Sequence, residues 1–160
     1  MAKQIKLTRG LFATVDDHNF EWLSQWKWCA LKPNKRIGFY AVRKDYSGEE
    51  PKLIYMHRVI AKTPAGLICD HINHDTLCNL EENLRNVTSA QNGWNRRGGC
   101  ATTGEKNIYM TKHGTFMVTI HKDRSLIFNK TFKTLEIAVT ARNEVLKEHF
   151  GEYAFNYLEG

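Results

Sequence analysis

The sequence contains no apolar stretch of the roughly 20 residues that a membrane-spanning helix needs. Its Met-Ala-Lys-Gln start does not lead into the apolar core of a signal peptide. We therefore expect a cytoplasmic protein without a membrane partner. The chain also lacks an internal repeat of the kind that builds solenoids.

Cysteines are few and widely spaced, and no two of them form a C-x-x-C motif. In a reducing compartment such cysteines are free thiols, and a zinc knuckle is disfavoured. A hydrophobic share of 42% and a charged share of 25% are ordinary for a globular protein, so wholesale disorder is disfavoured as well. A chain of 160 residues can hold one medium domain or two small ones.

The net charge of +6, with a pI near 9.2, favours a nucleic-acid partner. Ribosome-binding and membrane-surface proteins carry a similar excess, so charge alone does not decide. Residues 1–100 carry fifteen basic and ten acidic side chains, whereas residues 101–160 carry eight and seven. Nucleic-acid binding by the C-terminal part must therefore be argued from its pattern.

The first 60 residues predict a small β-rich scaffold. Residues 1–15 are extended around a turn at 8–10, and a short helix capped by Asp16 or Asp17 runs to Trp26. Two strands, over 38–43 and 52–60, follow it. The tryptophans of this region could stack on bases, but large rings more often form the core of a small domain.

The central stretch predicts a strand, a loop, a second strand and a helix. The apolar residues 67–69 deliver Asp70 and His71, residues 74–82 form a loop, and residues 84–88 return as a strand. A helix capped by Thr88 or Ser89 then runs to about residue 97. Neighbouring side chains on a regular strand face opposite ways, so bringing Asp70 and His71 to one site requires a bend near residues 69–72.

A composition shift at residues 98–104, rich in glycine and threonine, predicts a linker. Beyond it, the pattern predicts strands over 107–111, 116–120 and 125–132. A helix capped by Thr134 follows and ends at Gly151. The fold class is therefore α+β, with residues 1–97 as one module and residues 105–160 as another.

The central stretch has the chemistry for cutting a phosphodiester bond. Mg²⁺ prefers oxygen ligands and keeps several bound waters, so a protein needs to supply only a few ligands. The carboxylate of Asp70 and the amide oxygen of Asn92 are suitable protein ligands. His71 can take a proton from water near neutral pH. A zinc site at His71 and His74, supported by a cysteine, is a weaker alternative because no paired cysteines accompany it.

The segment Asp70-His71-Ile72-Asn73-His74, with Asn83-Leu84-Arg85 and Gln91-Asn92 at their spacing, resembles the HNH motif of the homing-endonuclease branch. The resemblance implies a ββα-metal fold and a divalent metal ion, Mg²⁺ with Mn²⁺ as the alternative. It makes His71 the general base, Asp70 and Asn92 the metal ligands, and Asn83 the residue that pins the loop. Upstream, His57 lies in a segment that also resembles this branch. It could support the base or face a phosphate, and a structural histidine is an equal alternative.

The resemblance extends over nearly the whole chain. Residues 5–58 resemble the N-terminal half of such enzymes, and residues 105–158 resemble an AP2-type DNA-binding domain. Two departures, in the loop at 77–80 and in the residues of the C-terminal sheet, limit what can be transferred about DNA contacts. The candidate DNA contacts are Arg85, Arg96, Arg97, Lys106, Tyr109, Lys112, His121, Lys122, Arg124 and Lys130.

Together these patterns predict a metal-dependent endonuclease acting on double-stranded DNA, as a monomer or homodimer. By resemblance it is a homing or mobile enzyme of a phage or intron, working in a bacterial host or phage-infected cell. A DNA-binding regulator that kept the fold without the chemistry is the main alternative. An RNA-binding or ribosome-associated basic protein is the third.

Overall fold

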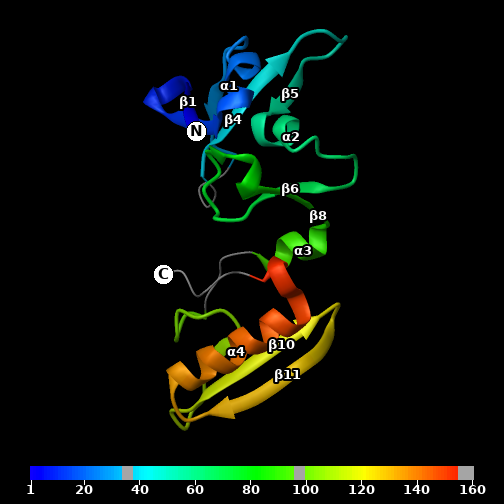
Figure 1. Cartoon of the computed structure of the whole chain (residues 1–160). Coiled ribbons are helices and arrows are strands. Elements are labelled where there is room, and N and C mark those ends of the chain that lie inside the picture. The colour runs from blue at the N-terminus through cyan, green and yellow to red at the C-terminus, as the bar shows by residue number, and fades with distance from the viewer. Residues whose placement is uncertain (34–37, 96–99, 155–160) are drawn as a thin grey trace. The chain divides into compact units, whose positions relative to one another are not determined.

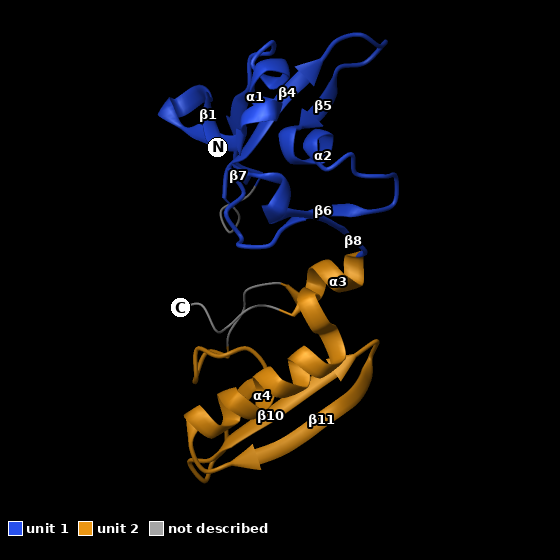
Figure 2. Ribbon diagram, in the orientation of Figure 1, with its two compact units in different colours: residues 1–88 blue, residues 89–160 orange. Residues whose placement is uncertain are grey.

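The computed structural model describes residues 1–33, 38–95 and 100–154, whose helices and strands are drawn in Figure 1. The chain divides into two compact units, residues 1–88 and 89–160 (Figure 2). Each unit combines small sheets with helices, so the predicted α+β class is confirmed.

The N-terminal unit begins with a hairpin and a short helix. These elements are β1 (Ala2–Lys6), the 3₁₀ turn η1 (Thr8–Gly10), β2 (Phe12–Asp16) and α1 (Asp17–Leu23). β1 and β2 pair antiparallel, and the turn between them has a positive φ at Gly10, which glycine adopts without strain. α1 ends at Leu23, before the predicted Trp26, where the Trp28 indole folds back and donates to the Leu23 carbonyl at 2.8 Å.

A second sheet follows, with β4 at its centre. Its strands are β3 (Cys29–Leu31), β4 (Tyr40–Asp45) and β5 (Lys52–Tyr55), and α2 (Met56–Ile60) comes directly after β5. The prediction of one strand over 52–60 is therefore wrong beyond Tyr55. Met56, His57 and Ile60 are buried together on α2, and a short apolar run does not distinguish this helical spacing from a strand.

The two sheets and two helices described so far share one hydrophobic core. Its largest fully buried apolar side chains are Leu23, Trp28 and Met56. Trp26 is instead partly exposed, with the Arg43 guanidinium 4.6 Å from the centre of its ring. Trp28 thus serves the aromatic core that the sequence favoured over base stacking.

The unit closes with the motif region: β6 (Ile68–His71), β7 (Cys78–Asn79), the 3₁₀ turn η2 (Glu81–Asn83) and β8 (Leu84–Val87). The predicted strands at 67–69 and 84–88 are present. The predicted loop at 74–82 contains β7, which pairs parallel with β2 through Thr14↔Cys78 and Val15↔Asn79. A two-residue strand has no periodicity to detect, so only the folded chain reveals this pairing.

The C-terminal unit is a three-stranded antiparallel sheet with one long helix. Its elements are α3 (Ser89–Trp94), β9 (Ile108–Met110), β10 (Phe116–Lys122), β11 (Ser125–Phe132), α4 (Leu135–Phe150) and the 3₁₀ turn η3 (Gly151–Tyr153), with β10 central. The Thr134 hydroxyl accepts from the Ile137 amide at 3.3 Å, and Gly151 ends α4 with a positive φ. The predicted strands and helix of this region are confirmed.

Apolar side chains of the sheet pack against α4, and Trp94 of α3 joins this core, its ring 4.7 Å from that of Phe150. Arg142 is fully buried on α4 and donates to the Glu105 carboxylate at 2.9 Å and to the Lys106 carbonyl at 3.0 Å. The packing of Trp94 groups α3 with the C-terminal unit. The sequence instead predicted a module boundary at a linker over 98–104, of which residues 98 and 99 lie outside the described residues.

No helix within the described residues is long and apolar enough to cross a bilayer.

Candidate active site

Strands β6 and β8 form an antiparallel ribbon that carries the Asp-His pair. Their register runs unbroken from Ile68↔Val87 to His71↔Leu84. The bend expected at residues 69–72 is therefore not present up to His71. Asp70 and His71 sit at successive positions of a paired strand and meet different partners.

Asp70 turns toward Arg85, which lies directly opposite it in the ribbon. The Nε and Nη2 atoms of Arg85 donate to Asp70 Oδ2 at 3.1 and 2.9 Å. Both side chains are largely buried, which strengthens a charge-assisted pair of this kind. Arg85, predicted as a DNA contact, thus holds the carboxylate in place here.

His71 is buried, and its Nε2 lies 3.3 Å from the side-chain oxygen of Asn79. Burial lowers the pKa of the His71 imidazole below its usual value, although the Asn79 bond and the charges of Asp70 and Asp75 oppose this shift. The ring is therefore neutral at neutral pH. A neutral imidazole can accept a proton, as a general base must.

His57 lies behind His71, with the two ring centres 5.0 Å apart. The Tyr40 ring contacts both histidines, at 5.3 Å from His57 and 6.1 Å from His71. Burial lowers the pKa of His57 to about 3, with smaller effects from His71 and Arg58. His57 is thus a buried neutral ring that packs against the candidate base.

Asn83 ties together the loop between β6 and β8. Its Oδ1 accepts from the Asn73 amide at 3.0 Å, and its Nδ2 donates to the Cys78 carbonyl at 2.7 Å. The side chain is buried, so both bonds are protected from water. This geometry suits the pinning role that the resemblance implies for this asparagine.

Other predicted residues of the site belong to the C-terminal unit or fall outside the described residues. Asn92 is in α3, which belongs to the C-terminal unit. Arg96 and Arg97 lie outside the described residues. Asn79 and Tyr40, which contact His71, were not predicted. The sequence signal that could have pointed to Asn79 is an asparagine inside the predicted loop of the motif.

The predicted DNA contacts of the C-terminal unit fall into two groups. Five of them are exposed: Tyr109, Lys112, His121, Arg124 and Lys130. Lys106 and Lys122 do not project from an exposed sheet face as expected. Their ammonium groups donate to the backbone carbonyls of Trp94, at 3.2 Å, and His149, at 2.7 Å, where a positive charge complements the end of a helix.

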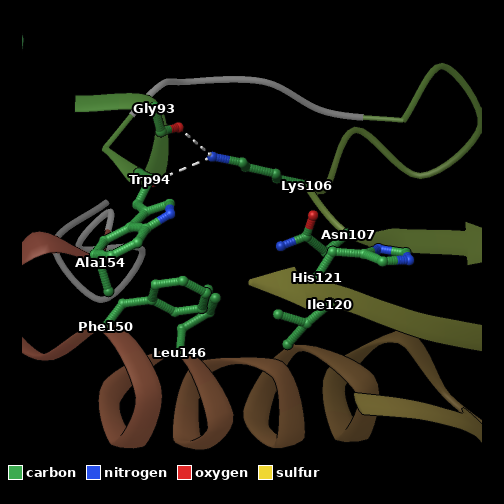
Figure 3. Close-up of a pocket in the computed structure, with 9 residues that line it drawn as sticks. All are labelled: Gly93, Trp94, Lys106, Asn107, Ile120, His121, Leu146, Phe150 and Ala154. Atoms are coloured by element: carbon green, nitrogen blue, oxygen red, sulfur yellow. Dashed lines mark hydrogen bonds between the residues drawn. The ribbon is translucent and has the colours of Figure 1, made fainter. Parts of the chain in front are cut away.

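A pocket of about 210 Å³ lies where α3, α4 and the sheet of this unit meet (Figure 3). Trp94, Phe150 and Ile120 line it, and Lys106 reaches across it to the Gly93 and Trp94 carbonyls. It is smaller than the roughly 300 Å³ at which small-molecule sites usually begin. We assign it no ligand.

Metal-ligating side chains come together at a different place in the N-terminal unit. Among the described residues, Asp16, His18 and Glu81 form the one group of three histidine, cysteine or acidic side chains with ligand atoms within 4.8 Å of one another. They are at least partly exposed, and His18 is hydrogen-bonded to Glu81 at 2.9 Å. The zinc alternative at His71 and His74 finds no such grouping.

A comparison with protein families places the motif region. Residues 55–94 match the family model described as HNH endonuclease, a segment that contains His57, Asp70, His71, Asn83 and Asn92. Residues 55–94 therefore carry the similarity to HNH endonucleases, enzymes that hydrolyse DNA phosphodiester bonds and typically use a divalent metal ion.

An uncharacterized HNH endonuclease of Acanthamoeba polyphaga mimivirus is 27% identical to this chain over 146 residues. The alignment covers 91% of this chain and 74% of the viral protein. The similarity therefore continues beyond the matched motif into both units. No solved structure matches the chain.

Proposed function

We propose that this protein cuts double-stranded DNA at the ribbon of β6 and β8, with His71 activating the attacking water. The observation that carries the proposal is the setting of His71. Its imidazole is buried, lies next to the carboxylate-bearing Asp70 in the chain, and is held by Asn79 at the end of a paired strand. A base must be neutral and held in one orientation to take a proton efficiently.

Asp70 and Asn92 are the proposed ligands of the divalent cation, which we propose to be Mg²⁺, with Mn²⁺ as the alternative. Carboxylate and amide oxygens suit a hard cation. Two hydrogen bonds from Arg85 hold Oδ2 of Asp70 in place. The role of Asn92 rests on the sequence motif. When bound, the cation supplies charge neutralisation at the phosphate and at the departing 3′ oxygen.

The residues of the chain would then divide the remaining work. His71 takes the proton of the water as it attacks phosphorus, while the rings of His57 and Tyr40 fill the space behind it. Asn83 holds the loop that leads away from His71. A fixed base and a fixed loop lower the entropic cost of reaching the reactive geometry.

We propose that the C-terminal unit grips DNA and sets the preferred sequence, as an AP2-type domain would. A three-stranded sheet can enter a major groove, and the exposed Tyr109, His121 and Lys130 stand on its strands. By resemblance, the biological setting is a homing or mobile endonuclease of a phage or intron.

A plasmid-nicking assay in Mg²⁺ or Mn²⁺ tests the activity. We expect His71→Ala to lower the rate at least 100-fold, because general-base catalysis contributes about 10²–10⁴. His113→Ala is the matched control, since His113 is exposed in a turn outside the proposed site. If the wild type cuts no better than His71→Ala with any divalent ion, the protein is a DNA-binding regulator or an RNA-binding protein. Competition between duplex DNA and structured RNA at matched salt separates those two.

A further inference from the structure

Asn79 is a buried polar residue whose side chain contacts the proposed base, His71. Its side chain is fully buried, and its Oδ1 lies 3.3 Å from Nε2 of His71. Buried polar groups carry a large penalty when unpaired, so the partners of such an amide constrain one another.

The orientation of the Asn79 amide follows from its other contacts. Its Nδ2 donates to the Leu77 carbonyl at 3.2 Å and approaches the Met56 sulfur at 3.7 Å. Both of these atoms are acceptors. A flipped amide would set its oxygen against a carbonyl oxygen and lose the donor, so Oδ1 is the atom that faces His71.

An amide oxygen can only accept, so Nε2 of His71 must carry the proton of the neutral ring. The lone pair is then on Nδ1. We propose that Asn79 is a positioning residue that selects this tautomer of His71 and holds the ring, so that Nδ1 is the nitrogen that takes the proton from water. This inference rests on the proposed function, because it deepens the role of His71 as the base.

The backbone makes Asn79 a rigid support. It lies on β7, which pairs parallel with β2, and the Thr14 amide donates to the Leu77 carbonyl at 2.9 Å. The same carbonyl accepts from Asn79, so strand pairing and amide orientation reinforce each other. With His57 packed against another edge of the ring, His71 is restrained from two directions.

Three variants of the full-length chain test the proposal. Asn79→Leu keeps the approximate volume and removes the acceptor. Asn79→Asp keeps an oxygen acceptor for His71, replaces the donor to Leu77 with a second oxygen, and adds a negative charge. Cys78→Ala is the control on the same strand, since the Cys78 side chain is not part of the proposed site and is only partly buried.

Two measurements at pH 8 read out the variants. Long-range ¹H–¹⁵N correlation spectra of histidine-labelled, metal-free protein report the His71 tautomer, with His71→Gln giving the assignment. Single-turnover cleavage with Mg²⁺, alongside DNA affinity in Ca²⁺, separates the chemical step from binding. A purely structural role would not move the tautomer.

We expect the wild type and Cys78→Ala to carry the proton on Nε2. Asn79→Leu should lose that preference and cut 10- to 100-fold more slowly, the range typical of residues that orient a catalytic group, with DNA affinity changed less than twofold. Asn79→Asp should keep the tautomer and recover part of the rate.

A wild-type proton on Nδ1 would overturn the proposal, as would a folded Asn79→Leu that keeps both tautomer and rate. If Asn79→Leu does not fold, the wild-type spectrum and the Asn79→Asp variant still test the proposal, because both report which nitrogen of His71 carries the proton. If the tautomer responds as expected but the wild type cuts no DNA, the Asn79–His71 contact stands and the nuclease proposal fails.

Discussion

At the scale of single residues, His57 shows how burial sets the charge of the region behind the base. Its ring is 6% exposed, and no partner for Nδ1 is found among the described residues. Protonating it would place a charge in a desolvated cluster beside His71, which is why its pKa falls to about 3. The fold therefore holds this histidine neutral at a free-energy cost that appears only in acid.

We predict that His57 makes the protein acid-sensitive. Between about pH 3 and 6.5, the unfolded chain binds a proton at His57 that the folded chain does not, so stability rises with pH across this window and is complete above it. Lowering the pH from 6.5 to 5 should reduce the free energy of unfolding by on the order of 2 kcal/mol through His57. Urea unfolding of His57→Phe at pH 7 and pH 5 should show a pH-dependent loss smaller by about this amount.

His113→Gln serves as the comparison, because this histidine is exposed in a turn of the C-terminal unit. An identical pH dependence in wild type and His57→Phe would contradict the lowered pKa.

At the scale of elements, the Asn83 side chain joins two parts of the loop between β6 and β8. Asn83 bridges the Asn73 amide at one end of the loop and the Cys78 carbonyl beyond its middle. Backbone groups that lose a buried partner must find water or remain unpaired. Asn83 thus holds the loop together within the nuclease motif, in addition to the pairing of β7 with β2.

We predict that Asn83→Ala loosens this loop. Hydrogen exchange at the Asn73 amide should accelerate, and the unfolding free energy should fall by roughly 1–3 kcal/mol, the cost of an unsatisfied buried group. Asn86→Ala is the control, because the Asn86 amide bonds to the Ala61 carbonyl at the exposed surface. Unchanged protection at Asn73 would show that other contacts hold the loop.

Helices and strands whose ends carry capping or turn residues could be predicted from the sequence. Elements whose conformation depends on tertiary contacts could not. Thr134 and Gly151 mark α4 because capping is local chemistry. The helix at Met56 and the strand at Asn79 depend on which surface each segment buries, and that surface is assembled from distant parts of the chain.

The candidate site divides in the same way. Asp70, His71 and Asn83 lie within one short segment, so their spacing alone indicates a site. The contacts of His71 with Asn79 and Tyr40 come from tertiary packing and follow from no spacing. The sequence did not predict the ion pair of Arg85 with Asp70, because an arginine in a basic protein is first interpreted as a phosphate contact.

At the scale of the whole molecule, the two units have separate hydrophobic cores, one around Trp28 and one around Phe150. Units of this size can fold alone when their apolar residues are satisfied internally. Trp94 belongs to the second core, although it lies inside the matched nuclease motif. The matched motif, which ends at residue 94, therefore extends past the boundary between the compact units at residue 88.

We predict that fragments cut after Thr88 fold better than fragments cut after residue 97. Fragment 89–160 keeps Trp94 against Phe150, and fragment 98–160 loses it, which should cost roughly 2–4 kcal/mol as a large core truncation does. Thermal unfolding followed by circular dichroism compares the two. Equal stability would favour the boundary at the linker predicted from the sequence.

The parallel pairing of β7 with β2 makes the nuclease motif dependent on sequence far outside it. The Glu81 amide donates to the Asp16 carboxylate at 2.8 Å, across 65 positions of the chain, and Asn19 binds the Glu81 side chain. Residues 55–94 are therefore not a portable cassette. Grafted alone onto another protein, they would lose β2, the strand that pairs with β7 and so supports Asn79. Substitutions in the first twenty residues would then impair the enzyme without changing the motif.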